Sequence, residues 1–224
     1  LAVAAFGQPG VQAGHRIARV GPCHADGGKT ELPAGGADFF LECRVIHCGV
    51  LIVHSPDVTA VFELPDETAT QQLGEKLAPL LQPGLVVYLE GDLGAGKTTL
   101  SRALIRALGH MGPVKSPTYS LVEVYVISSL YLYHFDFYRF ESPEEFLDAG
   151  FDEYFNETAA CLVEWPERAA GCLPPPDLRL YLHHTADGGR VLEAVADTER
   201  GQACLNATIS AGGVAACCVA PAPR

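Results

Sequence analysis

The feature that most constrains the fold is a glycine-rich run, "GDLGAGKTT", at residues 91–99. A short apolar segment, "LVVYL" at 85–89, precedes it, and apolar residues at helical spacing follow it as far as Gly109. A strand, a loop of the form G-x-x-x-x-G-K-[ST] and a helix, in this order, are typical of a phosphate-binding P-loop. Glycines let successive backbone N–H groups converge on phosphates, and the following helix adds the positive end of its dipole.

The whole loop is therefore expected to bind a nucleotide. Lys97 should reach the β- and γ-phosphates, and the Thr98 hydroxyl should ligate Mg²⁺. The alternative is a tight turn with a solvated lysine. The candidate nucleotide-binding residues are Asp92, Leu93, Gly94, Ala95, Gly96, Lys97, Thr98 and Thr99.

A second "GGKT", at residues 27–30, has Cys23 where the pattern requires a glycine, and no well-formed strand leads into it. We interpret it as a chance match.

Strand-like and helix-like segments alternate through the middle of the chain. Predicted strands lie at 58–64, 85–89, 120–126, 131–137 and 160–165, followed by a hairpin of strands at 178–184 and 190–196. Helices are expected to begin at Pro65–Asp66, after the glycine loop and around 142–150. The predicted class is α/β, a P-loop NTPase-type αβα sandwich with a mixed or mostly parallel central sheet.

Composition suggests three zones. Residues 1–57 are rich in Ala and Gly and are interpreted as an N-terminal extension, either disordered or the product of a misassigned start. Residues 58–200 form the expected P-loop ATPase domain. Residues 201–224 are expected to be a C-terminal tail without a clear element.

Charge and composition exclude several classes of function. A formal net charge of −12 argues against a protein that neutralises many backbone phosphates, so DNA is excluded and any connection with RNA is expected to be indirect. The apolar runs are too short to span a membrane. Eight cysteines without regular spacing indicate free thiols, no structural metal is expected, and the location should be cytoplasmic.

Two carboxylates end apolar strands. Asp136 ends "YLYHFD" and Glu164 ends "CLVE", so both are candidate Mg²⁺ ligands and catalytic groups beside Lys97. The alternative for each is ordinary solvation at a strand end. In "SPTYS", at 116–120, the Thr118 hydroxyl could reach the γ-phosphate or Mg²⁺ as a switch segment does, or it could cap a turn made by Pro117.

The identity of the nucleotide and the reaction remain open at this point. A GTPase would need N-K-x-D and D-x-x-G, and the chain has neither, so ATP is favoured. Hydrolysis is the leading hypothesis. A P-loop kinase for a small metabolite and a non-hydrolysing nucleotide sensor are the alternatives.

Four motifs, "GDLGAGKTT", "KSPTYSLVE", "HFDFYR" and "LVEWPER", in this order, resemble the TsaE (YjeE) family of bacterial ATPases. The resemblance implies ATP/ADP and Mg²⁺ as cofactors and a role in making threonylcarbamoyladenosine on tRNA together with TsaD and TsaB. It places Asp136 near Mg²⁺, Thr118 in a switch-like loop, and Glu164 with Trp165 at the catalytic edge. Phe137 and Val124 depart from the residues usual in the family without affecting this chemistry.

Overall fold

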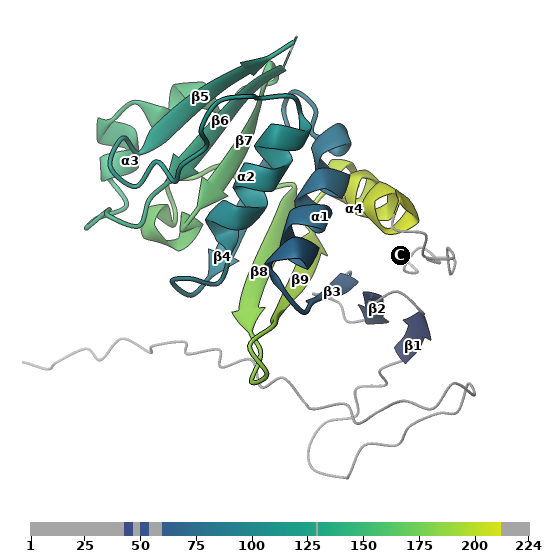
Figure 1. Ribbon diagram of the computed structural model, residues 1–224. Coiled ribbons are helices and arrows are strands. Elements are labelled where there is room, and N and C mark those ends of the chain that lie inside the picture. The colour runs from purple at the N-terminus through teal and green to yellow at the C-terminus, as the bar shows by residue number, and fades with distance from the viewer. Residues whose placement is uncertain (1–42, 47–49, 54–59, 129, 212–224) are drawn as a thin grey trace, which may run out of the picture. The chain divides into compact units, whose positions relative to one another are not determined.

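Nine strands form one mixed sheet in the computed structural model, which describes residues 43–46, 50–53, 60–128 and 130–211 (Figure 1). The order across the sheet is β1-β2-β3-β9-β8-β4-β7-β6-β5. Strands β8, β4, β7 and β6 pair in parallel, and all other neighbours are antiparallel. The expected α/β class with a mixed sheet is confirmed. The strands are β1 Cys43–Ile46, β2 Val50–Val53, β3 Ala60–Leu64, β4 Val86–Gly91, β5 Val122–Ile127, β6 Leu130–Asp136, β7 Ala159–Glu164, β8 Leu178–His184 and β9 Arg190–Ala196.

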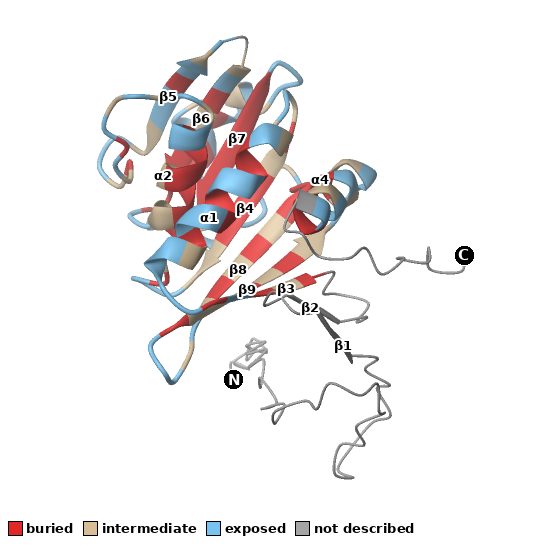
Figure 2. Ribbon diagram, turned by 45° about the vertical axis from the view of Figure 1, so that its right-hand side comes forward, coloured by how far each residue is buried: buried red, intermediate tan, exposed pale blue. Residues whose placement is uncertain are grey.

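The parallel centre of the sheet is buried on both faces. Every residue of β7 is buried, as expected for a strand that reads as one continuous apolar run (Figure 2). Residues of alternate parity along each strand point to opposite faces, so they enter two different apolar clusters. Leu162 belongs to the cluster under the long helices, whereas Val163 packs with the aromatic side chains on the opposite face.

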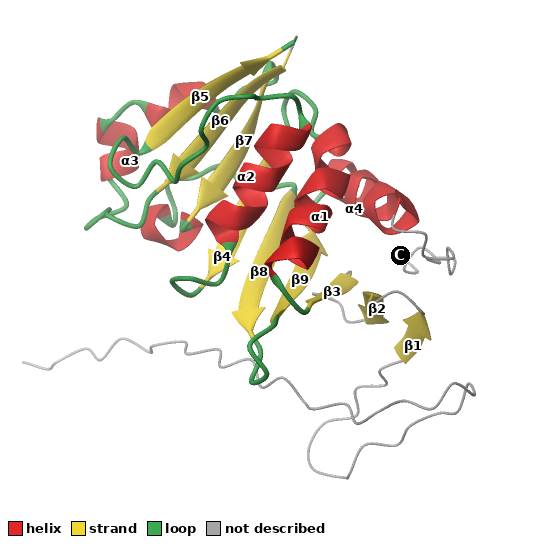
Figure 3. Ribbon diagram, in the orientation of Figure 1, coloured by secondary structure: helices red, strands yellow, loops and turns green. Residues whose placement is uncertain are grey.

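Helices cover both faces. Helices α1 (Glu67–Leu77), α2 (Lys97–Ala107) and α4 (Glu199–Ala211) lie along one face, as Figure 3 shows. The short helices α3 (Glu145–Asp148) and η2 (Phe151–Tyr154) contribute Phe146 and Phe151 to the aromatic cluster on the other face. The remaining short helices are η1 (Ala78–Leu80) and η3 (Pro166–Ala169).

The start of α1 is fixed by a side-chain cap. The Asp66 carboxylate accepts a hydrogen bond from the Ala69 amide at 2.8 Å, which satisfies one of the amides that a helix start leaves free. The predicted helix start at Pro65–Asp66 is confirmed.

The sheet and its helical cover extend beyond both expected domain boundaries. The sheet continues beyond β3 into residues 43–46 and 50–53, because β2 pairs with β3 and β1 pairs with β2. After residue 200, α4 places Cys204, Leu205 and Ile209 in the apolar core, where they add to the cover of the sheet. Residues 1–42, which include the second "GGKT", and residues 212–224 lie outside the described part.

Helix α4 should therefore contribute to stability. Leu205 is buried in the core, so replacing it by Ala is expected to lower the free energy of unfolding by about 2 to 5 kcal/mol. The neighbouring Asn206 is exposed, and Asn206→Ala should change the free energy of unfolding by no more than about 0.5 kcal/mol. Urea unfolding of the two variants checks this expectation. Equal stabilities would show that α4 does not belong to the cooperative fold.

Cys161, Cys172 and Cys204 are free thiols. Burial raises the pKa of Cys161 to about 12 and that of Cys204 to about 11, so both are protonated, apolar core residues at neutral pH. Across the described residues, no helix combines the length and apolar character that crossing a bilayer requires.

Candidate nucleotide-binding site

The glycine loop lies at the carboxyl end of β4, between that strand and α2 (Figure 1). The parallel register sets Leu89 of β4 beside Glu164 of β7, and Glu164 beside Asp136 of β6. Three carboxyl strand ends therefore meet at one edge of the sheet. In open α/β sheets, ligands bind at this edge.

The backbone of the loop needs glycine. Gly91, Gly94 and Gly96 have φ angles of 128°, 82° and 109°, a region that side-chain-bearing residues rarely adopt. A Cβ atom on Gly91 would also lie 2.2 Å from the Leu182 carbonyl oxygen. Among the described residues, none accepts a hydrogen bond from the amides of Gly94, Gly96, Lys97 or Thr98. The loop thus presents a group of free N–H donors at the start of a helix, which suits a phosphate.

Lys97 is buried against the same loop. Its Nζ donates to the carbonyls of Gly91 at 2.5 Å and Asp92 at 2.9 Å, and it lies 3.7 Å from the centre of the Trp165 ring. Burial lowers the pKa of Lys97, while the nearby Glu164 carboxylate opposes that shift. Trp165 has a φ of 60°, an uncommon conformation that turns the chain sharply after β7 and brings its ring over Lys97.

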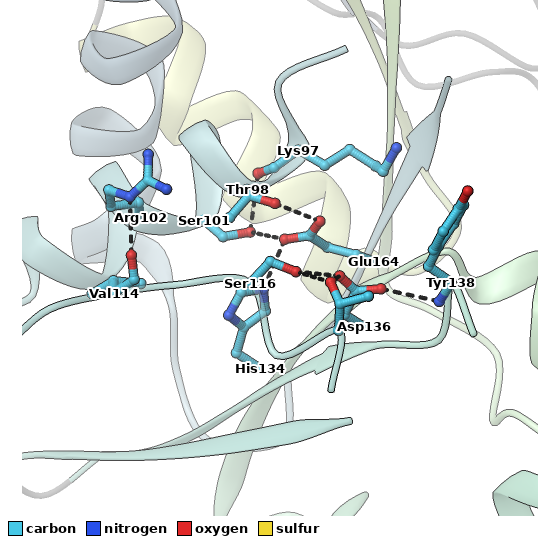
Figure 4. A network of polar contacts seen from close by, with 11 residues as sticks. Lys97, Thr98, Ser101, Arg102, Val114, Ser116, His134, Asp136, Tyr138 and Glu164 are labelled. Carbon is cyan, nitrogen blue, oxygen red and sulfur yellow. Dashed lines mark hydrogen bonds and ion pairs between the residues drawn. The ribbon is translucent and has the colours of Figure 1, made fainter. Parts of the chain in front are cut away.

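Glu164 lies at the centre of a network that joins β7 to α2 and β6 (Figure 4). Thr98 Oγ1 donates to Glu164 Oε2 at 2.9 Å. Ser101 Oγ donates to the other oxygen, Oε1, at 3.3 Å, and His134 Nε2 lies 2.8 Å from that same oxygen. The carboxylate is 2% exposed, so these partners offset the cost of its burial.

Asp136 is the centre of a second network, which ties down the 116–118 segment. Thr118 Oγ1 donates to Asp136 Oδ2 at 2.7 Å, Ser116 donates to the same oxygen, and the Tyr138 amide donates to Oδ1 at 3.0 Å. Just before this segment, Arg102 Nε of α2 donates a hydrogen bond to the Val114 carbonyl at 3.0 Å. Thr118 therefore lies beside a candidate Mg²⁺ ligand.

Four polar residues at or near the site are not among the predicted site residues, although His134 and Ser116 lie within two of the sequence motifs. Ser101 and His134 contact Glu164, and Ser116 contacts Asp136. Arg190, at the start of β9, packs against the loop so closely that a Cβ on Gly96 would lie 3.2 Å from its Nε. That Nε is buried and has no hydrogen-bond partner in the described residues. The position of Thr98 at the start of α2 does indicate Ser101, which follows one helical turn later on the same face.

The residues fit a nucleotide with Mg²⁺. The unpaired loop amides and the unpartnered Arg190 Nε are donors suited to phosphate oxygens. The Thr98 hydroxyl and the carboxylates of Asp136 and Glu164 are oxygen ligands of the kind that Mg²⁺ prefers. No group of three or more His, Cys, Asp or Glu side chains in the described part could hold a metal unaided. An ion here would depend on phosphates and water as well, which is usual for Mg²⁺.

Comparison with known proteins decides the family. A family model described as "Threonylcarbamoyl adenosine biosynthesis protein TsaE" matches residues 64–192. The chain belongs to the TsaE family. The matched range runs from the end of β3 into β9, so it includes the glycine loop, both carboxylates and the hairpin that carries Arg190.

Two curated relatives and one solved structure agree with this assignment. The tRNA threonylcarbamoyladenosine biosynthesis protein TsaE of Haemophilus influenzae is 43% identical over 149 residues, which cover 64% of this chain and 94% of that protein. The protein of the same name from Bacillus subtilis is 40% identical over 126 residues, 56% of this chain and 77% of that one. The crystal structure of Bacillus subtilis YdiB superposes with a TM-score of 0.59 at 29% identity, covering 67% of this chain and 94% of YdiB.

Proposed function

We propose that this TsaE-family chain binds ATP with Mg²⁺ and hydrolyses it to ADP and phosphate in support of threonylcarbamoyladenosine modification of tRNA. The observation that carries the proposal is the glycine loop, whose free amides and buried Lys97 face the edge of the sheet where two carboxylates meet. Lys97 and the loop amides bind the phosphates, and Thr98 with Asp136 and Glu164 provides oxygen ligands for the ion.

The residues divide between binding and chemistry. Bound Mg²⁺ would neutralise charge on the phosphates. Lys97 reaches the terminal phosphates, and Thr118 supplies a hydroxyl on the side of Asp136. Glu164 orients the attacking water, because its carboxylate is fixed beside Thr98 at the first turn of α2. Trp165 covers Lys97 and limits its exposure to solvent.

We further infer that the protein works in the cytoplasm with TsaD and TsaB, and that tRNA is met only through these partners. The net charge of −12 supports an indirect role, because direct RNA binding needs a basic surface. The motif resemblance to the TsaE family supports the choice of partners.

Phosphate release tests the proposal and its alternatives. Turnover of ATP by the full chain should rise on addition of purified TsaB and TsaD. Turnover that instead requires a small metabolite would favour a kinase, and binding without turnover would favour a nucleotide sensor. Omitting Mg²⁺ is the matched control, and it should abolish the stimulated rate.

A further inference from the structure

His134 is a buried polar residue to which the proposed chemistry assigns no role. It lies on β6 and is 0% exposed, and its Nε2 is 2.8 Å from Glu164 Oε1. A carboxylate oxygen can only accept, so Nε2 carries the hydrogen and donates it. The other ring nitrogen, Nδ1, is buried and has no partner within the described part of the chain. The contact with Glu164 is therefore the polar contact that accounts for an imidazole at this position.

The two oxygens of Glu164 have different surroundings. Oε1 faces inward and receives His134 and Ser101, whereas Oε2 receives the Thr98 hydroxyl at the start of α2 (Figure 4). A glutamate side chain has three rotatable bonds, and its terminal torsion is broad. Donors from two separate elements on one oxygen fix the plane of the carboxylate, so that the second oxygen points to the loop.

We propose that His134 is a positioning residue that, assisted by Ser101, fixes the orientation in which Glu164 acts on the nucleotide. The inference rests on the proposed ATPase function and adds to it a determinant of the catalytic geometry. Its physical basis is that misplacing a catalytic group by about 1 Å can slow a reaction by about 10²-fold without affecting how the substrate binds.

A merely structural histidine would behave differently. Leu132 lies two residues earlier on the same strand, so it points to the same face, and it is also 0% exposed. It packs in the apolar core under the helices and is not part of the Glu164 network. Leu132→Ala is therefore the matched control for loss of core packing on β6.

The test compares His134→Leu, which removes the donor and keeps the bulk, with His134→Gln, whose side-chain amide can donate from nearly the same place. ADP affinity, melting temperature and the TsaB- and TsaD-stimulated rate of ATP hydrolysis are measured for the full chain, with Glu164→Gln as the inactive reference. His134→Leu should lower kcat by about 10- to 100-fold with ADP affinity within about twofold. His134→Gln should recover most of the rate, and Leu132→Ala should lose stability but keep its kcat.

Each other outcome counts against the inference. A parental kcat in His134→Leu, when Glu164→Gln is inactive, would overturn the positioning role and leave the ATPase function intact. Equal losses in His134→Leu and His134→Gln, matched by Leu132→Ala at the same melting temperature, would assign His134 to packing. A parent chain that never hydrolyses ATP would overturn the proposed function itself, and this inference with it.

Discussion

Lys97→Ala is expected to weaken ATP binding by about 10- to 100-fold, since a hydrogen bond to a charged group contributes about 1.5 to 3 kcal/mol and each 1.4 kcal/mol is tenfold in affinity. The substitution removes a buried cation from a loop that still offers its free amides. Residual binding should therefore persist. The measurement is a titration of the variant with ATP in the presence of Mg²⁺.

Two arginine variants test whether the loss of ATP binding is specific to cations at the loop. Arg190 contacts the loop at Gly96, so Arg190→Gln should also weaken ATP binding, by about tenfold. Arg106 is exposed in the last turn of α2, the helix that follows the loop, and Arg106→Gln should bind ATP as the parent does. Near-parental affinity in Lys97→Ala, with a normal melting temperature, would contradict the assignment of the loop as a phosphate site.

Features set by short stretches of chain could be predicted from the sequence. The strand, loop and helix around residues 91–99 form one local unit, and its glycines have positive φ because the turn itself requires them. The adjacency of Asp136 and Glu164 could be predicted because each ends an apolar run, and parallel strands bring such ends to one edge of the sheet.

Contacts that depend on how distant elements dock could not be predicted in the same way. Ser101 and Glu164 are 63 residues apart, and they meet because of how α2 packs on β7. Arg190 reaches the loop because of the register of the β8–β9 hairpin beside β4. Neither Ser101 nor Arg190 belongs to a sequence motif that indicates what it contacts.

Helix α4 was missed for a different reason. Cys204, Leu205 and Ile209 are spaced as one face of a helix, but they stand in a stretch rich in Ala and Gly. The short strands β1 and β2 were missed because four residues are too few for a period to be recognised. In both cases contacts with the rest of the fold, strand pairing for β1 and β2 and core packing for α4, decide the structure more than local sequence does.

The largest effect on turnover is expected from substitution of the two strand-end carboxylates, Glu164 and Asp136. The two variants should differ in whether they also lose nucleotide binding. Glu164→Gln should leave ATP binding nearly intact and reduce hydrolysis by about 10²-fold or more, the range that a positioned acid–base group supplies. Asp136→Asn should weaken Mg²⁺-dependent nucleotide binding and also slow turnover. The reason is that Asp136 is a proposed ligand of the ion and also anchors Ser116 and Thr118 through hydrogen bonds.

Titrating each variant with ATP, with and without Mg²⁺, measures binding, and phosphate release in the presence of TsaB and TsaD measures turnover. Binding and transition-state stabilisation are separate quantities, so a variant can lose one and keep the other. Full hydrolysis by Glu164→Gln would show that its carboxylate serves the structure or faces a partner. In that case the hydrogen bonds from Thr98, Ser101 and His134 would stabilise the buried Glu164 carboxylate without orienting it for catalysis. Asp136 would then become the candidate for the water-orienting role.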